Sequence, residues 1–291
     1  MKRTLSLCAG IFLALCATGC SKKAEVYTKV PENPGVFMKK LNVSDSFIRG
    51  VDVSTVIAQE KSGVVYKDAD GNPQDIFKTL RDNGVNYIRV RLWNNPFDDN
   101  GKGFGGGNND LDSVIEIGKR AAKEGMPLLV DFHYSDFWAD PAKQQPPRAW
   151  NNFDVNKKCD AIYDFTKSSL TKIRAAGNSV GMVQIGNETT GFMWGEKNWT
   201  SICKMMNAGS KAVREVSKDI KVVLHFANPE KEGEYLRYAQ ILKHNKVDYD
   251  VFASSWYPYW HGTKDNLTKV LKQVADFSEK EILLAEFSAC G

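Results

Sequence analysis

The feature of this sequence that most restricts its fold is a regular alternation of short apolar runs with longer amphipathic runs. The short runs are rich in valine, isoleucine and leucine, as is typical of strands buried on both faces of a sheet. Gly84, Gly125 and Gly177 stand just past three of the longer runs, where glycine commonly ends a helix. The predicted strands are residues 50–54, 85–93, 127–133, 180–187, 220–226, 250–256 and 281–287, and the predicted helices lie near 74–83, 110–124, 156–176, 198–217, 232–245 and 266–278. Strict alternation implies a parallel sheet with right-handed crossovers.

Polar and aromatic residues gather just after the predicted strands, whereas the segments leading into the strands have no such clusters. Examples are His133-Tyr-Ser-Asp-Phe-Trp138 and Trp256-Tyr-Pro-Tyr-Trp-His261. A (β/α)8 TIM barrel, an α/β fold, has its functional residues at the rim formed by the C-terminal ends of its strands, and its other rim is structural. A doubly wound sheet would concentrate its site at one switch point, and no dinucleotide fingerprint follows the first strand. The glycine-rich segment 101–107 lacks the Lys-Ser/Thr of a phosphate loop, and we interpret it as a flexible lid.

Two glutamates each end one of the short apolar runs. Glu188 closes Val180-Gly-Met-Val-Gln-Ile-Gly-Asn-Glu188, and Glu286 closes Glu281-Ile-Leu-Leu-Ala-Glu286. A carboxylate at the C-terminal end of a barrel strand lies on the face where active sites are built. Glycoside hydrolysis requires two carboxyl groups, one as acid/base and one as nucleophile or base. A single glutamate is more often a cap or an ion-pair partner, but two in matched settings favour this chemistry.

Side chains at neighbouring strand ends suit the same reaction. Asn187 is placed to donate its amide to a sugar 2-hydroxyl, or else to satisfy backbone groups at the strand end. Arg89 and Arg91 share one face of a strand, and an arginine near Glu286 would hold that carboxylate ionised. Their alternative is an internal ion pair with no catalytic role. His133 is a candidate to hydrogen-bond a sugar or a catalytic carboxylate, with a structural histidine as the alternative.

Several aromatic residues offer flat apolar faces with polar edges, which suit stacking on pyranose rings. Trp138 and Trp256 are the stronger candidates because polar residues surround them, and Trp93 continues the face of the two arginines. Some of the remaining tryptophans are expected in the core. Asp52 and Asp136 are candidates to bind sugar hydroxyls, with loop or cap roles equally open.

These motifs resemble the endo-β-1,4-galactanases of glycoside hydrolase family 53, from about residue 48 to the end. The matching segments are Gly50-Val-Asp-Val-Ser, Gly84-Val-Asn-Tyr-Ile-Arg-Val-Arg-Leu-Trp93, Asp131-Phe-His-Tyr-Ser-Asp-Phe-Trp-Ala-Asp-Pro141, Pro-Arg-Ala-Trp150, Val183-Gln-Ile-Gly-Asn-Glu188, Trp256-Tyr-Pro and Glu286-Phe-Ser. The resemblance implies that Glu188 is the acid/base after strand 4 and Glu286 the nucleophile after strand 7. It also implies retaining hydrolysis of β-1,4-galactan, the polymer of pectic arabinogalactan side chains, with Tyr257 beside the substrate and without a cofactor.

Two other interpretations of function stay open. The first is another retaining barrel glycosidase, of mannanase or cellulase type, because the pocket that recognises the axial 4-hydroxyl of galactose is not visible in a sequence. The second is a non-catalytic glycan-binding lipoprotein. The presence of both Glu188 and Glu286 argues against it.

Only seven strands can be counted, and the sequence stops a few residues after Glu286, where the family continues with a helix and an eighth strand. An unclosed sheet leaves hydrogen-bonding groups on its first and last strands without partners. Each unmet buried group costs about 1–3 kcal/mol, against a net stability of about 5–15 kcal/mol. The expectation is therefore a catalytic barrel domain over residues 47–291, truncated after strand 7 and impaired in folding.

The N-terminal segment has the features of an export signal. A charged start and an apolar stretch too short to span a bilayer lead into Ala17-Thr-Gly-Cys20. This resembles the lipobox of bacterial lipoproteins, in which Cys20 would be acylated, while plain secretory cleavage is the alternative. We expect a signal over residues 1–20, a polar tether over 21–46, and a lipid-anchored protein of the bacterial periplasm or outer membrane.

Charge and cysteine content exclude other classes. A net charge of +4 over 291 residues, with scattered basic residues, does not indicate a nucleic-acid surface. Beyond the predicted signal only Cys159, Cys203 and Cys290 remain, an odd number without close spacing, which does not indicate a disulfide framework or a zinc site. Free buried thiols are expected, with a bridge between Cys159 and Cys203 left open. No metal site is expected.

Overall fold

The computed structural model describes residues 43–288 of the chain. The chain divides into two units, Met1–Phe47 and Ile48–Gly291, and all the described strands and helices belong to the second. The predicted signal, the lipidation site Cys20 and most of the predicted tether lie outside the described residues, as does Cys290. Among residues 43–288, no helix has both the length and the apolar character needed to cross a membrane.

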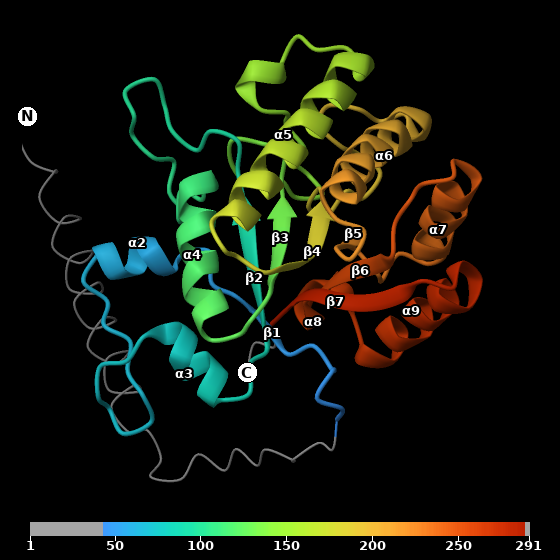
Figure 1. The fold of residues 1–291 in the computed structure, drawn as a ribbon. Coiled ribbons are helices and arrows are strands. Elements are labelled where there is room, and N and C mark those ends of the chain that lie inside the picture. The colour runs from blue at the N-terminus through green and yellow to red at the C-terminus, as the bar shows by residue number, and fades with distance from the viewer. Residues whose placement is uncertain (1–42, 289–291) are drawn as a thin grey trace, which may run out of the picture. The chain divides into compact units, whose positions relative to one another are not determined.

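Seven parallel strands form one sheet, and their spatial order is their order in the sequence (Figure 1). They are β1 (Gly50–Asp52), β2 (Tyr87–Leu92), β3 (Leu128–Phe132), β4 (Val180–Ile185), β5 (Lys221–Phe226), β6 (Val251–Trp256) and β7 (Glu281–Phe287). Each strand pairs with the one before it after a helical connection, which confirms the predicted (β/α) barrel architecture. Within the described part of the chain, β1 and β7 each have one neighbour in the sheet.

Six long helices connect the strands close to the predicted positions. They are α3 (Ile76–Asp82), α4 (Leu111–Lys123), α5 (Val155–Ala175), α6 (Trp199–Val216), α7 (Glu234–His244) and α9 (Lys264–Ser278). Short polar side chains begin most of them: Asp110 accepts a hydrogen bond from the Ser113 backbone N–H, and Asp154 from that of Lys157. Three short helices were not predicted, namely α2 (Val56–Lys61), η2 (Arg148–Trp150) and α8 (Pro258–His261).

Two apolar layers lie on the two faces of the sheet. The larger lies between the strands and the surrounding helices, several of which Figure 1 shows outside β2, β3 and β4. The smaller lies on the inner face and consists of Leu129, Met182, Val223, Val251 and Ala253. Half-buried residues of β2 and β7, and Ile48 just before β1, pack against it. The inner layer fills the lower part of the barrel. The inner face nearer the C-terminal ends of the strands is therefore left for polar side chains.

The two described cysteines beyond the predicted tether lie in the outer layer. Cys159 on α5 and Cys203 on α6 are both buried and neither forms a disulfide. The prediction of free buried thiols is confirmed for this pair.

Candidate active site

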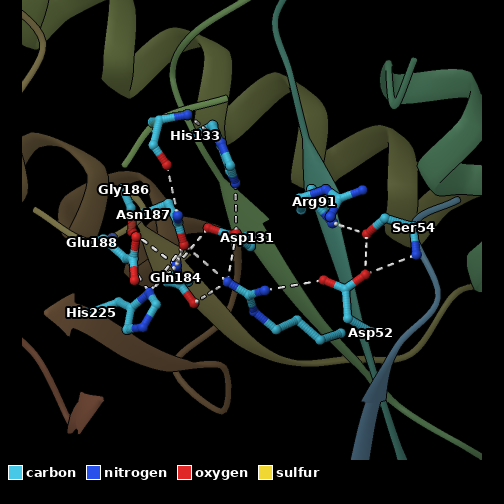
Figure 2. Close-up of polar contacts among 12 residues, drawn as sticks. Asp52, Ser54, Arg91, Asp131, His133, Gln184, Gly186, Asn187, Glu188 and His225 are labelled. Atoms are coloured by element: carbon cyan, nitrogen blue, oxygen red, sulfur yellow. Dashed lines mark hydrogen bonds and ion pairs between the residues drawn. The ribbon is translucent and has the colours of Figure 1, made fainter. Parts of the chain in front are cut away.

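Polar side chains replace apolar ones on the inner face towards the C-terminal end of each central strand. Arg89, Asp131, Gln184, His225 and Ser255 come from β2, β3, β4, β5 and β6 in turn, and each is buried. Because side chains alternate between the two faces of a strand, these residues continue the inner apolar layer upward. The result is a buried polar cluster beneath the rim of the barrel (Figure 2).

Glu188 reaches this cluster through a sharp turn at the end of β4. Gly186 has a φ of 81°, and Glu188 itself has a φ of 46°, in the left-handed region. A Cβ on Gly186 would stand 2.6 Å from the Cγ2 of Thr189, so only glycine fits there. The Gln144 amide donates to the carbonyl of Asn187 at 2.7 Å and supports the turn. Glu188 is only 8% exposed.

Glu286 reaches the same cluster through an irregularity in β7. Ser254 pairs with Leu284, but Ser255 pairs with Glu286, so Ala285 is an extra residue in the strand. A bulge of this kind changes the face that the next side chain takes. The Glu286 carboxylate thereby lies 2.7 Å from the Nη2 of Arg89, and the Tyr257 hydroxyl donates to its other oxygen at 2.8 Å.

Arg89 is the hub of the cluster. Its Nη1 lies 3.0 Å from a carboxylate oxygen of Asp52, and its Nη2 lies 2.8 Å from one of Asp131. Nη2 also donates to the amide oxygen of Asn187 at 3.0 Å (Figure 2). Burial opposes the charge of Arg89, but Asp131, Glu286 and Asp52 together raise its pKa. The guanidinium is a fixed cation that orients the nearby carboxylates.

The two glutamates have pKa values displaced in opposite directions. Burial, followed by the negative charge of Glu286, raises the pKa of Glu188 to about 7. Burial also opposes ionisation of Glu286, but Arg89 and His225 lower its pKa below the ordinary value. Burial raises the pKa of Tyr257, which stays a neutral hydroxyl donor to Glu286. Near neutral pH the site thus pairs a protonated carboxyl group with an ionised one, a proton donor beside a potential nucleophile.

His133 and Asn187 are bonded within the protein. The His133 Nε2 lies 3.0 Å from Asp131, and its Nδ1 accepts from the Ala139 backbone N–H at 3.2 Å. His133 is fully buried. The Asn187 amide nitrogen donates to the Ala139 carbonyl at 2.8 Å. Both side chains therefore shape the loop after β3 as well as the carboxylate cluster.

Arg91, two residues beyond Arg89, lies apart from Glu286 among aromatic side chains. Its guanidinium carbon is 4.1 Å from the centroid of the Trp138 ring, and Nη2 donates to the carbonyl of Gly106 at 2.9 Å. Burial lowers the pKa of Arg91. Trp138 is 37% exposed, whereas Trp93 is fully buried beneath it. Trp138 therefore presents a face to solvent and Trp93 supports it.

The remaining predicted residues lie around the rim. Asp52 accepts from the backbone N–H and the hydroxyl of Ser54, in addition to pairing with Arg89. Asp136 accepts from the backbone N–H groups of Asn95 and Arg148, so it organises the loops after β2 and β3. The indole N–H of Trp256 donates to the carbonyl of Gly262 at 3.2 Å.

Four residues of the cluster were not predicted from the sequence: Asp131, Gln184, His225 and Ser255. Asp131 is fully buried; burial opposes its ionisation, but Arg89 and His133 lower its pKa to about 2. Gln184 donates to Asp131 at 2.6 Å and to Asn187 at 3.1 Å. The signal was present in the sequence, because each is a single polar residue near the end of an apolar strand, where a buried polar group needs a partner.

The described residues contain no group of three or more histidine, cysteine or acidic side chains arranged to hold a metal ion.

The model of glycosyl hydrolase family 53 matches residues 48–290. An endo-beta-1,4-galactanase of Bacillus subtilis is 53% identical over 96% of this chain and 66% of its own length, and an arabinogalactan endo-beta-1,4-galactanase of Cellvibrio japonicus is 34% identical over 82% and 65%. The chain thus spans about two thirds of the length of these relatives.

Two solved structures have the same fold at appreciable identity. The GH53 catalytic domain of Ignisphaera aggregans superposes with a TM-score of 0.81 at 39% identity, over 84% of this chain and 69% of the other. A fungal beta-1,4-galactanase structure superposes with a TM-score of 0.74 at 33% identity, over 82% and 73%.

Proposed function

Because the chain belongs to glycosyl hydrolase family 53, we propose that it cleaves internal β-1,4 linkages of galactan with retention of anomeric configuration. The observation that carries this proposal is the pair of carboxyl groups with opposed pKa values, a raised one for Glu188 and a lowered one for Glu286. Retaining glycosidases need one protonated and one ionised carboxyl group in the same site.

In the first step the ionised Glu286 attacks the anomeric carbon, and protonated Glu188 donates its proton to the departing glycosidic oxygen. Arg89 and Tyr257 each hold one oxygen of Glu286 and so fix the direction of attack. The bond from carbon to the leaving oxygen breaks as the bond to Glu286 forms. The product is a glycosyl ester on Glu286 and a released sugar chain.

In the second step Glu188, now ionised, removes a proton from water as the water attacks the anomeric carbon. The ester bond breaks, Glu286 leaves as a carboxylate, and Glu188 is protonated again. Loss of the negative charge on Glu286 in the ester lowers the pKa of Glu188, because repulsion by Glu286 is one cause of its elevation. The same residue therefore changes from acid to base between the two steps.

Galactan is proposed as the substrate because the relatives from B. subtilis and C. japonicus are named as galactanases. Asp52 and the exposed face of Trp138 lie at the rim and suit contact with sugar hydroxyls and a sugar ring, respectively. We propose that the natural substrate is this polymer as it occurs in pectic arabinogalactan side chains.

The test is digestion of potato galactan, mannan and cellulose by the full chain, by Glu188→Gln and by Glu286→Gln. We expect oligosaccharides from galactan alone with the unchanged protein and none with either variant. An aryl galactoside with a good leaving group should still glycosylate Glu188→Gln, because its departure needs little protonation. Release from mannan or cellulose instead would reject the substrate, and equal loss with both substrates would reject Glu188 as the acid.

We further propose that the protein is exported and attached to a bacterial membrane through a lipid on Cys20. The support is the sequence Ala17-Thr-Gly-Cys20 behind a charged and then apolar segment. Cys20→Ser should move the protein from the membrane fraction to the soluble fraction. A mature N-terminus mapped by mass spectrometry to any other residue would reject the lipid anchor.

A further inference from the structure

His225 is a fully buried polar side chain on the inner face of β5 that the two-carboxylate mechanism does not use. Its Nδ1 lies 3.1 Å from the amide nitrogen of Gln184, 3.4 Å from the backbone nitrogen of Glu188 and 3.0 Å from the amide oxygen of Asn187. Its Nε2 lies 2.9 Å from the hydroxyl of Ser255. Figure 2 shows the ring beneath the turn that presents Glu188.

The ring of His225 is neutral at neutral pH. Burial lowers its pKa to about 4, and although Glu286 and Asp131 act in the opposite direction, Arg89 and His133 reinforce the effect of burial. A neutral imidazole has one nitrogen that donates a hydrogen bond and one that accepts. Which nitrogen holds the proton decides what Ser255 can do.

The neighbours of Nδ1 identify it as the acceptor. The backbone N–H of Glu188 points to it at 3.4 Å, whereas the two hydrogens of the Gln184 amide go to Asp131 and Asn187. The oxygen of Asn187 is close as well, but it already accepts from Arg89 at 3.0 Å and from Gln184 at 3.1 Å, which uses both lone pairs. The proton therefore lies on Nε2, which donates it to Ser255.

Ser255 is then free to donate its own hydroxyl proton, and the carboxyl group of Glu188 lies near enough for this hydroxyl to lower its pKa. Contacts therefore run from the Glu188 backbone N–H through His225 to Ser255, and a hydrogen bond from Ser255 to the Glu188 side chain would close them into a circuit. One end of the circuit lies at a residue with a φ of 46°, a conformation that is strained for a side chain of this size.

We propose that His225 and Ser255 are positioning residues that hold Glu188 in its left-handed conformation and direct its carboxyl group by a hydrogen bond. The role given to Glu188 rests on the proposed function, but the circuit itself does not. Burial and the negative charges of Glu286 and Asp140 raise the pKa of Glu188, whereas the hydroxyl of Ser255 and the charge of Arg89 lower it. Ser255 therefore favours the ionised form of Glu188. It thereby stabilises the form that acts as base in the second step.

The proton position on His225 is tested by nitrogen-15 nuclear magnetic resonance of the full chain labelled at histidine. The sequence has four histidines, and His225→Gln identifies the signal by its loss. If that variant does not fold, contacts between the ring protons and Ser255 identify the signal in the unchanged protein. We expect the neutral Nε2–H tautomer from pH 5.5 to 8. An Nδ1–H tautomer or an imidazolium at pH 7 would overturn the proposal.

The bond from Ser255 to Glu188 is tested by carbon-13 titration of the glutamate carboxyl groups, with Glu188→Gln identifying the signal. Ser255→Ala should raise the titration midpoint of Glu188 by about one unit, because a hydrogen bond to its charged form is lost. Ser255→Thr, which keeps the hydroxyl, should restore it. Ser254→Ala is the matched control, since Ser254 bonds instead to Tyr235 at 2.7 Å.

An unchanged midpoint in folded Ser255→Ala, or an equal rise in Ser254→Ala, would reject the circuit. Both measurements use the resting protein without substrate. If galactan is not hydrolysed but His225 is the Nε2–H tautomer and Ser255→Ala raises the midpoint of Glu188, only the proposed function is rejected. If galactan is hydrolysed but these two results are not obtained, only the circuit is rejected.

Discussion

At the scale of single residues, the site depends on the geometry of one guanidinium. Arg89 contacts Asp52, Asp131 and Glu286 at once, at 3.0, 2.8 and 2.7 Å. A planar fork of donors can do this, whereas the compact ammonium of lysine cannot span three partners. Arg89→Lys keeps the charge and removes the geometry, so it separates the two contributions.

We expect Arg89→Lys to lower kcat on galactan by about 100-fold or more, because Glu286 loses its orientation and part of its stabilisation as an anion. The measurement is kcat and KM by reducing-sugar release, with circular dichroism to establish folding. Arg91→Lys is the comparison, since Arg91 contacts Gly106 and Trp138 instead of Glu286. Equal losses in kcat for the two variants would contradict the hub role of Arg89.

The opposed pKa values also predict the pH profile. The proposed mechanism needs Glu188 protonated and Glu286 ionised, so kcat/KM should follow a bell whose alkaline limb falls near pH 7, the pKa of Glu188. The acid limb should lie below the ordinary pKa of a glutamate, because the pKa of Glu286 is lowered. Rates measured from pH 3 to 9 test this, and an activity that keeps rising above pH 8 would contradict it.

Glu188 should make the fold less stable as pH rises. Its pKa is about 7 in the folded chain against 4.5 for an ordinary glutamate, so the folded state binds the proton more tightly. Stability from this group is present below pH 4.5 and is lost as pH rises through 7, by about 3 kcal/mol in all. The free energy of unfolding of Glu188→Gln, measured in urea, should therefore rise relative to that of the unchanged protein between pH 4.5 and 8. A constant difference across that range would be the contrary result.

At the scale of elements, the turn after β4 sets the position of Glu188, the proposed acid. Gly186→Ala places a Cβ 2.6 Å from Thr189 and 3.0 Å from Met193, so the turn must shift and move Glu188. We expect at least a tenfold loss of kcat, because small displacements of a catalytic group are costly. Gly191→Ala is the control: its φ of 76° is similarly unfavourable, but nothing lies within 4 Å of the added methyl group. Similar kcat losses in both would attribute the effect to backbone strain alone.

The length of an element decided whether it could be predicted from the sequence. The long helices and the seven strands were predicted because each repeats apolar residues at its own period over enough residues to be recognised. The helices α2, α8 and η2 were missed because three to six residues are too few to show a period. The bulge in β7 was missed as well, since the pairing of Glu286 with Ser255 depends on the neighbouring strand.

At the scale of the whole molecule, the proposed mechanism depends on two strands that are distant in the sheet. Glu188 follows β4 and Glu286 lies in β7. The charge of Glu286 nevertheless raises the pKa of Glu188, and the charges of both glutamates raise the pKa of Tyr257. We predict that their carboxyl groups lie about 5–5.5 Å apart, the separation of retaining enzymes. The first product released from galactan should then be the β-anomer by proton magnetic resonance. An initial α-anomer would indicate inversion, for which a separation of about 6.5–9.5 Å leaves room for water.

The sequence by itself determined the α/β barrel class and the position of the two glutamates at strand ends, because both follow from local patterns of apolar residues. Only the tertiary structure decided which arginine holds Glu286. Arg89 stands beside Asp52 in the register of β1 and β2, and its guanidinium reaches Asp131 and Glu286. Arg91 lies two residues nearer the C-terminal end of β2, and its guanidinium contacts Trp138 and Gly106 instead. Only the structure joined Asp131, Gln184, His225 and Ser255 into one cluster. Each is an isolated polar residue along the chain, and its partners come from other strands that only folding brings within hydrogen-bonding distance.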